Sequence, residues 1–370
     1  MLKKRVVQPV SVEQLDIMRS VADPIADNIA SGIFSSSDPK KLLADIAGIQ
    51  FNYDIVSAER FPEYIVDYFN STASFPDWLS ERKILQSSVF FEQHGQSIML
   101  CLMALSLPYC YAAGEDAEVL LLSQRIQNDT RKRLAETGQF VYDVMDKEAF
   151  KPSGRGIRSI QKVRLMHAVV RHQIKAYGKW DKTSLPINQE SMAGTNLAFS
   201  LIILRGLNKL YIEVSADEEA AYLHRWNVIG YLMGVSEELL PEGIEESIVL
   251  EKLIRQRHFK ESIAGKTLTK ALTDVATDFF PDRKPDDLLF PLMHHLLGTE
   301  IADYIGIPKG NTKTKIVEIL KFKNTLEGIF QIHSNTVTLK MKQQLMNETN
   351  NRKADFNAAE TSVDTGVANE

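Results

Sequence analysis

The stretch VRLMHAVVRHQI, Val163 to Ile174, decides how this chain can fold. Placed on a helix, its apolar side chains cover well over half of the circumference, which is typical of a helix that is mostly buried. One narrow polar stripe remains, made of Arg164, His167 and Arg171, with Lys175 one turn further on. Because an unpaired buried charge is very costly, this stripe needs an anionic partner.

Two kinds of partner fit this stripe. Carboxylates of the same chain would turn it into a buried ion-pair network, with His167 held by an ordinary hydrogen bond. Alternatively, His167 binds the iron of a haem, and Arg164 and Arg171 pair with the haem propionates or brace the helix. The spacing leaves both interpretations open, and a lone histidine on an apolar helix is more often structural.

The rest of the chain predicts an all-α fold, because nearly every periodic segment has the helical spacing. Residues 1–346 are predicted to form a single large multi-helix domain that encloses a hydrophobic cofactor pocket. Residues 347–370 are polar and are predicted to form a disordered tail. Several predicted helices matter below: Ser11–Ser31 with a break at Asp23-Pro24, Phe90–Leu107 ended by a bend at Pro108, Glu115–Met145, Ile157–Tyr177, Asn188–Leu204 and Thr312–Met346.

Composition excludes several classes of protein. The chain has 370 residues, of which 44% are hydrophobic and 25% charged, as in soluble globular proteins. A net charge of −5 argues against nucleic acid as the main partner. The longest apolar run, Ile98–Leu107, is too short to span a membrane. Cys101 and Cys110 lie in apolar surroundings and are interpreted as reduced core thiols. No secretory signal is visible, so a cytoplasmic location is expected.

A second constellation lies in the segment RLAETGQFV. Arg133, Glu136 and Thr137 fall at i, i+3 and i+4, which places them on one face of a helix. Such a face can form a pocket wall that positions oxygen or abstracts a proton. The same spacing is more often an exposed intrahelical Arg–Glu pair. Further along, Asn188 is a predicted N-cap, and Glu190 is expected to pair with Arg164 or Arg171.

Taken in order, six motifs resemble one family. They are HG at His94-Gly95, SLPYCYAA at Ser106–Ala113, RLAETGQFV at Arg133–Val141, GRGIRSIQKVRLMHAVVRH at Gly154–His172, INQESMAGTNLAFS at Ile187–Ser200 and HRWNVIGYLMGV at His224–Val235. This series is similar to the MpaB-type oxygenases and the latex clearing proteins, also called rubber oxygenases. The resemblance is strongest over residues 75–245, and the pairing of VRLMHAxxR with NQExMAGT is its most specific part.

The resemblance implies an all-α fold that binds one b-type haem without a covalent link. His167 matches the family's proximal iron ligand, and its other ring nitrogen is expected to donate to a carbonyl or carboxylate. Arg133 and Thr137 match polar positions on the distal side. Glu136 stands where rubber oxygenases carry a lysine that can cap the iron. Tyr109 lies in the segment where they place a catalytic glutamate, so Glu136 is the candidate to replace it.

The function implied is that of a haem-b-dependent oxygenase that uses molecular oxygen on a hydrophobic substrate, an isoprenoid or another alkene. Three alternatives remain open at this stage. The chain can be a non-catalytic haem-binding protein or a cofactor-free helical protein that binds a partner. It can also be a haem-free enzyme with Glu136 or Glu190 as its base. Oligomeric state and substrate identity are not encoded in any motif.

Overall fold

The computed structural model describes residues 10–54, 56–123, 130–176, 178, 180–276 and 285–310. Within these ranges all regular elements are helical, and a single isolated β-bridge joins Ala113 to Phe259. The predicted all-α class is therefore confirmed. The predicted helix Thr312–Met346 and the predicted tail 347–370 lie outside the described residues.

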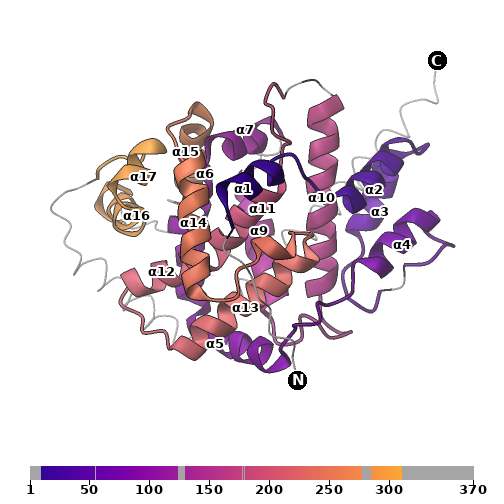
Figure 1. Cartoon of the computed structure of the whole chain (residues 1–370), viewed down its shortest axis with the longest axis horizontal. Coiled ribbons are helices and arrows are strands. Elements are labelled where there is room, and N and C mark those ends of the chain that lie inside the picture. Colours follow the sequence, from indigo (N-terminus) through magenta and orange to yellow (C-terminus); the bar gives the residue numbers. More distant parts are fainter. Residues whose placement is uncertain are drawn as a thin grey trace, which may run out of the picture.

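The helices follow one another along the chain as shown in Figure 1. Their bounds are α1 (Val12–Met18), α2 (Pro24–Phe34), α3 (Pro39–Ala47), α4 (Glu63–Ser71), α5 (Glu81–Cys101), η1 (Leu102–Ser106), α6 (Leu107–Tyr111), α7 (Gly114–Leu122), α9 (Thr130–Met145), α10 (Gly156–Ala176), α11 (Gln189–Phe199), α12 (Leu201–Lys209), α13 (Ala216–Leu232), η2 (Glu237–Leu239), α14 (Ile244–His258), α15 (Ile263–Ala276), η4 (Pro285–Asp287), α16 (Leu289–Leu297) and α17 (Thr299–Tyr304).

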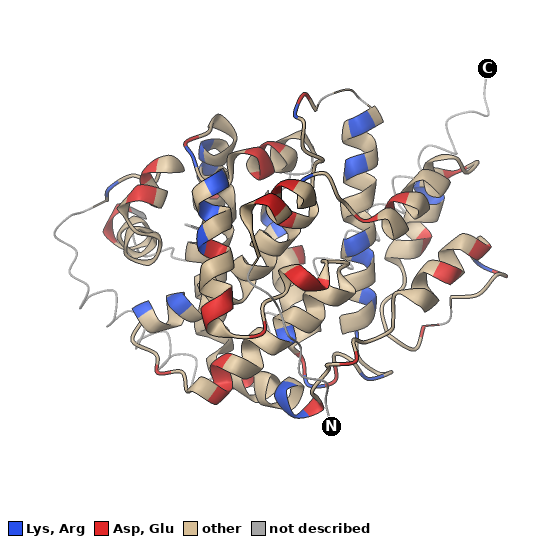
Figure 2. Cartoon of the chain, in the orientation of Figure 1, with Lys and Arg blue, Asp and Glu red and all other residues tan. Residues whose placement is uncertain are grey.

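Helix α10 separates two hydrophobic cores. Figure 1 shows it standing upright between α2, α3 and α4 on one side and the larger bundle on the other. Leu165, Ala168 and Val169 join the smaller core, which is otherwise built from α2, α3, α4 and the segments next to them. The larger core takes Ile160 from α10 and most of the other helices. Figure 2 shows basic residues, in blue, at several positions along α10.

The break predicted at Asp23-Pro24 is confirmed. Pro24 is the first residue of α2, where the missing N–H costs nothing because that donor has no helical partner. The Asp23 side chain caps α2 by accepting a hydrogen bond from the Ala26 N–H at 3.4 Å. Asn188 likewise caps α11 by accepting from the Ser191 N–H at 3.0 Å, as predicted.

Three predicted helix boundaries are wrong. The segment 115–145 is not one helix, because α7 ends at Leu122 and the Ser123 hydroxyl donates to the Leu120 carbonyl. The segment 188–204 is divided at Ser200, whose hydroxyl donates to Asn196 O. At Pro108 the chain does not bend away from the helical path. It passes through the π-helical turn η1 into α6, which accommodates a residue without an N–H.

The start of α5 depends on a histidine acting as an acceptor. The Ser80 N–H donates to Nε2 of His224 at 3.0 Å, which requires a neutral ring. Burial, with a smaller contribution from the Lys83 charge, lowers the pKa of His224 to about 4. The unfolded chain therefore takes up a proton at a higher pH than the folded chain does.

From this we predict an acid-sensitive contribution to stability. The contribution is complete above the unfolded pKa of about 6.5 and is lost as the pH falls towards about 4. In urea unfolding at pH 7 and pH 5, the wild type should lose about 2 kcal/mol more than His224→Gln, which does not titrate. Equal losses in the two proteins would contradict the assignment.

Both cysteines are free thiols, as predicted. Burial raises the pKa of Cys101 to about 12, so it is an inert core residue. Among the described helices, none has the length and apolar character needed to cross a membrane.

Candidate functional site

His167 lies on the face of α10 that is turned away from the smaller core. Val163 and Val170 are one turn before and after it on the same face. All three side chains keep part of their surface accessible, although α10 is packed on both sides. The His167 imidazole in the middle of α10 is therefore left partly uncovered by the small side chains of Val163 and Val170.

The protonation state of His167 follows from its surroundings. Burial is the largest cause that lowers its pKa, to about 4, and the positive charges of Arg171 and Arg133 lower it further. The ring is therefore neutral at physiological pH. A neutral imidazole is the form that binds a transition metal.

Neither ring nitrogen of His167 has a hydrogen-bond partner within the described part of the chain. Nδ1 is fully buried and unpaired, and no hydrogen bond reaches Nε2. The predicted bond from the second nitrogen to a carbonyl or carboxylate is therefore wrong for these residues. Buried polar atoms are almost always satisfied, so an unpaired imidazole in this position calls for an explanation.

Arg164 is satisfied by the protein itself. Its Nε donates to Asp23 Oδ2 at 2.6 Å and its Nη2 to Asp23 Oδ1 at 2.9 Å, a bidentate pair. Its Nη1 donates to the Leu232 carbonyl at 3.2 Å. Of the two partners considered for Arg164, the structure shows a protein carboxylate, and Arg164 braces α10 against the start of α2.

Arg171 is only partly satisfied. Its Nε donates to Asp27 Oδ1 at 2.7 Å and its Nη1 to the Ile187 carbonyl at 3.1 Å. The side chain is 1% exposed, yet Nη2 is buried with no partner in the described residues. Ile187 has φ = 52°, an uncommon value for a β-branched residue, so Arg171 holds a strained loop just before α11.

The three residues predicted on α9 do not stay together. The charge of Arg133 lowers the pKa values of both His167 and Cys110, so Arg133 lies on the inner side of α9. Thr137 donates its hydroxyl to the Arg133 carbonyl at 2.9 Å. Glu136 is 52% exposed and 4.0 Å from Lys132, so the structure places its carboxylate on the outer surface and not near His167.

Glu190 is fully buried, but its predicted pairing with Arg164 or Arg171 is wrong. It pairs with Arg257 at 2.8 Å and with His258 at 2.9 Å, both at the end of α14. Helix α14 packs against α11 and brings Arg257 and His258 to Glu190.

Sequence reasoning missed Asp116, on the first turn of α7. Its Oδ1 accepts a hydrogen bond from the Ser191 hydroxyl at 2.6 Å. Burial raises its pKa, and so does neighbouring Glu115. The charge of Asp116 raises the pKa of the Cys110 thiol and that of Arg133 lowers it, so both residues lie near this thiol. An acidic pair at a helix start is so common that nothing in the sequence marked this one.

Comparison with known proteins establishes the family. A sequence model of the family described as "ER-bound oxygenase mpaB/B'/Rubber oxygenase, catalytic domain" matches residues 93–317, more than half of the chain. The chain belongs to this family, which confirms the resemblance drawn from its motifs.

Two relatives show how far the similarity extends. The rubber oxygenase of Streptomyces sp. (strain K30) is 28% identical over 186 residues, which are 49% of this chain and 45% of that protein. The match thus spans less than half of the relative's length. The structure entitled "Structure of Latex Clearing Protein LCP in the closed state" superimposes with a TM-score of 0.73 and 20% identity, covering 89% of this chain and 90% of the other. The two proteins share an all-helical fold.

Proposed function

We propose that this chain is a haem-b-dependent oxygenase that uses molecular oxygen on a hydrophobic alkene of the isoprenoid class. The observation that carries the proposal is His167, a neutral imidazole on α10 to which no described residue makes a hydrogen bond at either nitrogen. Membership in an oxygenase catalytic-domain family supports the same assignment. A helical bundle without a cofactor would be expected to satisfy a histidine at this depth.

The residues present fit a haem. His167 would ligate the iron, and the spare Nη2 of Arg171 would donate to one propionate. Arg164 is not proposed as a propionate ligand, because two nitrogens of its guanidinium group already donate to Asp23. When bound, the haem supplies the redox chemistry with oxygen, and the protein supplies ligation, orientation and charge.

The catalytic residues proposed on α9 are Arg133 and Thr137. Arg133 brings a positive charge close enough to His167 to change its pKa, and this charge would stabilise negative charge that develops on oxygen. Thr137 adds a hydroxyl one turn further along α9. Glu136 is left out of the proposed site because its carboxylate is at the surface beside Lys132.

We assign the role of proton acceptor to Asp116. The Ser191 hydroxyl holds Oδ1, which leaves Oδ2 to take a proton from the substrate. Burial raises the pKa of this carboxyl and so makes its ionised form a stronger base than a surface carboxylate.

Asp116→Asn is therefore expected to lower kcat about 100- to 10,000-fold, the usual contribution of a general base. Haem absorption should be unchanged, because the asparagine still accepts from Ser191. Glu118→Gln is the matched control on α7, since Glu118 pairs with Lys182 at 3.4 Å near the surface and should be dispensable. Oxygen uptake checks both variants, and full activity of Asp116→Asn would exclude it as the base.

The test of the proposed function uses the purified full chain titrated with haemin. We expect a Soret band that saturates at one haem per chain, and iron in the same ratio. With a reductant present, squalene should then stimulate oxygen uptake, whereas squalane, its saturated counterpart, should not. A saturating Soret band without oxygen uptake would indicate a non-catalytic haem-binding protein. The absence of any Soret band would overturn the proposal.

A further inference from the structure

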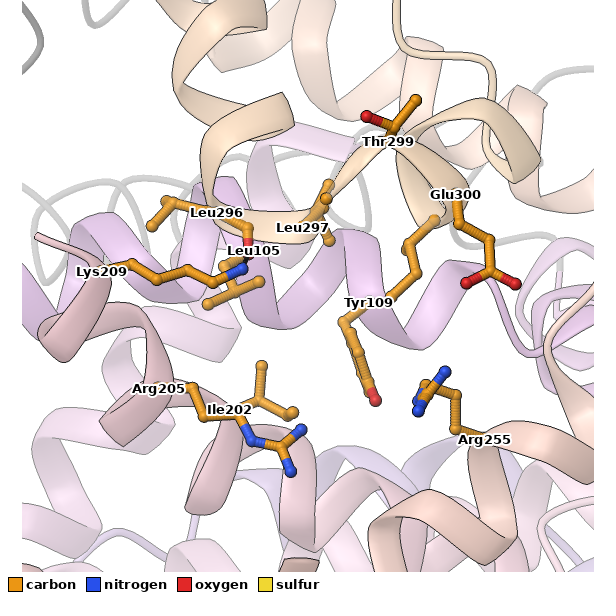
Figure 3. A pocket seen from close by; sticks show the side chains of 12 residues that line it. Leu105, Tyr109, Ile202, Arg205, Lys209, Arg255, Leu296, Leu297, Thr299 and Glu300 are labelled. Carbon is orange, nitrogen blue, oxygen red and sulfur yellow. Dashed lines mark hydrogen bonds between the residues drawn. The ribbon is translucent and has the colours of Figure 1, made fainter. Parts of the chain in front are cut away.

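A pocket of about 400 Å³ lies among the helices α6, α12, α14, α16 and α17. Its volume is in the range of ordinary small-molecule sites. Figure 3 shows the side chains that surround it. None of the residues proposed above for haem or catalysis lines this pocket, so it is a separate site.

Three basic side chains enter the pocket from two helices. Arg205 and Lys209 come from α12, and Arg255 comes from α14. In Figure 3 the guanidinium groups of Arg205 and Arg255 lie on either side of the Tyr109 hydroxyl, and the Lys209 ammonium lies along α16. The three cations are partly exposed to water, and their convergence around one cavity favours the binding of an anion.

Among the described residues, two carboxylates lie near these three cations. Glu251 is 3% exposed and accepts from Arg205 Nη1 at 2.6 Å and from Arg255 Nε at 3.0 Å. It also accepts from the Tyr109 hydroxyl. Glu251 lies behind the two arginines and does not line the pocket; Glu300 is the carboxylate among the lining residues, and the Tyr304 hydroxyl donates to it. Three positive charges against two negative ones leave an excess of one.

The uncompensated charge is best localised at Lys209. Its Nζ donates to the Leu296 carbonyl at 2.7 Å, and no described carboxylate pairs with it. Lys209 is an exposed residue at the mouth of the pocket, and partial burial together with the neighbouring charge of Arg205 lowers the pKa of its ammonium. A bound anion would relieve this repulsion.

The remainder of the wall is apolar. Leu105, Ile202 and Leu297 line the pocket beside the three cations, as Figure 3 shows. A ligand that fills the cavity must therefore carry a hydrocarbon part as well as a charge. This combination excludes a free inorganic ion as the best-fitting occupant.

We propose that this pocket binds a small amphiphilic monocarboxylate. Its carboxylate is held by Lys209 and the two guanidinium groups, and its hydrocarbon part lies on the apolar wall. One excess positive charge matches a monoanion. Glu251 accepts from one nitrogen of each guanidinium group, and the remaining N–H groups of Arg205 and Arg255 can donate to the carboxylate of the ligand.

The experiment is calorimetric titration of the full chain with n-octanoate. We expect one octanoate per chain, and an affinity that falls about tenfold or more in Lys209→Gln, because a hydrogen bond to a charged group contributes at least a decade in affinity. Lys252→Gln, an exposed lysine on α14 outside the pocket, is the matched control and should bind like the wild type. n-Octanol, with the same chain and no charge, should bind at least tenfold more weakly than octanoate.

Three outcomes would overturn the proposal. The first is equal affinity of Lys209→Gln and wild type, with both folded by circular dichroism. The second is octanol binding as tightly as octanoate, which would indicate an unspecific apolar cavity. The third is inorganic phosphate binding more tightly than octanoate, which would indicate a phosphate site. His167→Ala should bind octanoate like the wild type, so this proposal and the proposed haem site fail or succeed separately.

Discussion

His167→Ala is expected to abolish the Soret band of the chain after titration with haemin. The reason is that a b-type haem is held without a covalent bond, so the axial imidazole is the strongest link between iron and protein. His172→Ala is the matched control on the same helix. His172 stacks on Phe34 with ring centroids 4.4 Å apart, on the side of α10 that faces the smaller core. Its replacement should leave the Soret band in place.

Loss of the ligand can be separated from loss of the fold. Nδ1 of His167 has no partner in the described residues, so alanine breaks no hydrogen bond there. The thermal unfolding of the haem-free His167→Ala protein should therefore match that of the haem-free wild type. In His167→Gly, added imidazole should restore part of the Soret band. An unchanged Soret band in His167→Ala would refute His167 as the iron ligand.

The polar stripe on α10 could be predicted because helical spacing is local information. Arg164, His167 and Arg171 are neighbours on any helix, and their need for counter-charges follows from burial alone. The carboxylates that pair with these arginines cannot be identified from local sequence. Asp23 and Asp27 come from α2, more than a hundred residues earlier in the chain, and meet α10 only through tertiary packing. Glu190 is closer in sequence but faces α14.

The position of the partly buried Asp116 carboxylate could not be predicted from the sequence for a related reason. Spacing placed Glu136 on the same helical face as Arg133, but i+3 neighbours are far enough apart for one to point inward and the other outward. Asp116 has the sequence context of an ordinary helix-start acid. Its burial depends on α11, which supplies Ser191 as its hydrogen-bond partner. Such burial arises from the packing of helices distant in sequence.

The buried ion pair that fixes α10 gives the largest expected effect on stability. The Asp23 side chain is 4% exposed, and among the described residues its charged partner is Arg164. Arg164→Met should leave this carboxylate buried without its counter-charge, which costs about 3–5 kcal/mol of unfolding free energy. Urea unfolding of the haem-free chain measures this cost.

Two further variants show whether the loss of unfolding free energy comes from the unpaired Asp23 carboxylate. Asp23→Ser keeps a side chain that caps α2 but removes the charge, so the double variant Asp23→Ser/Arg164→Met should recover most of the loss. Arg171→Met is the matched single variant, because its partner Asp27 is 31% exposed and stays hydrated when unpaired. It should therefore cost less than Arg164→Met. If both single variants cost the same and the double variant recovers nothing, the lost stability comes from arginine packing and not from the buried charge.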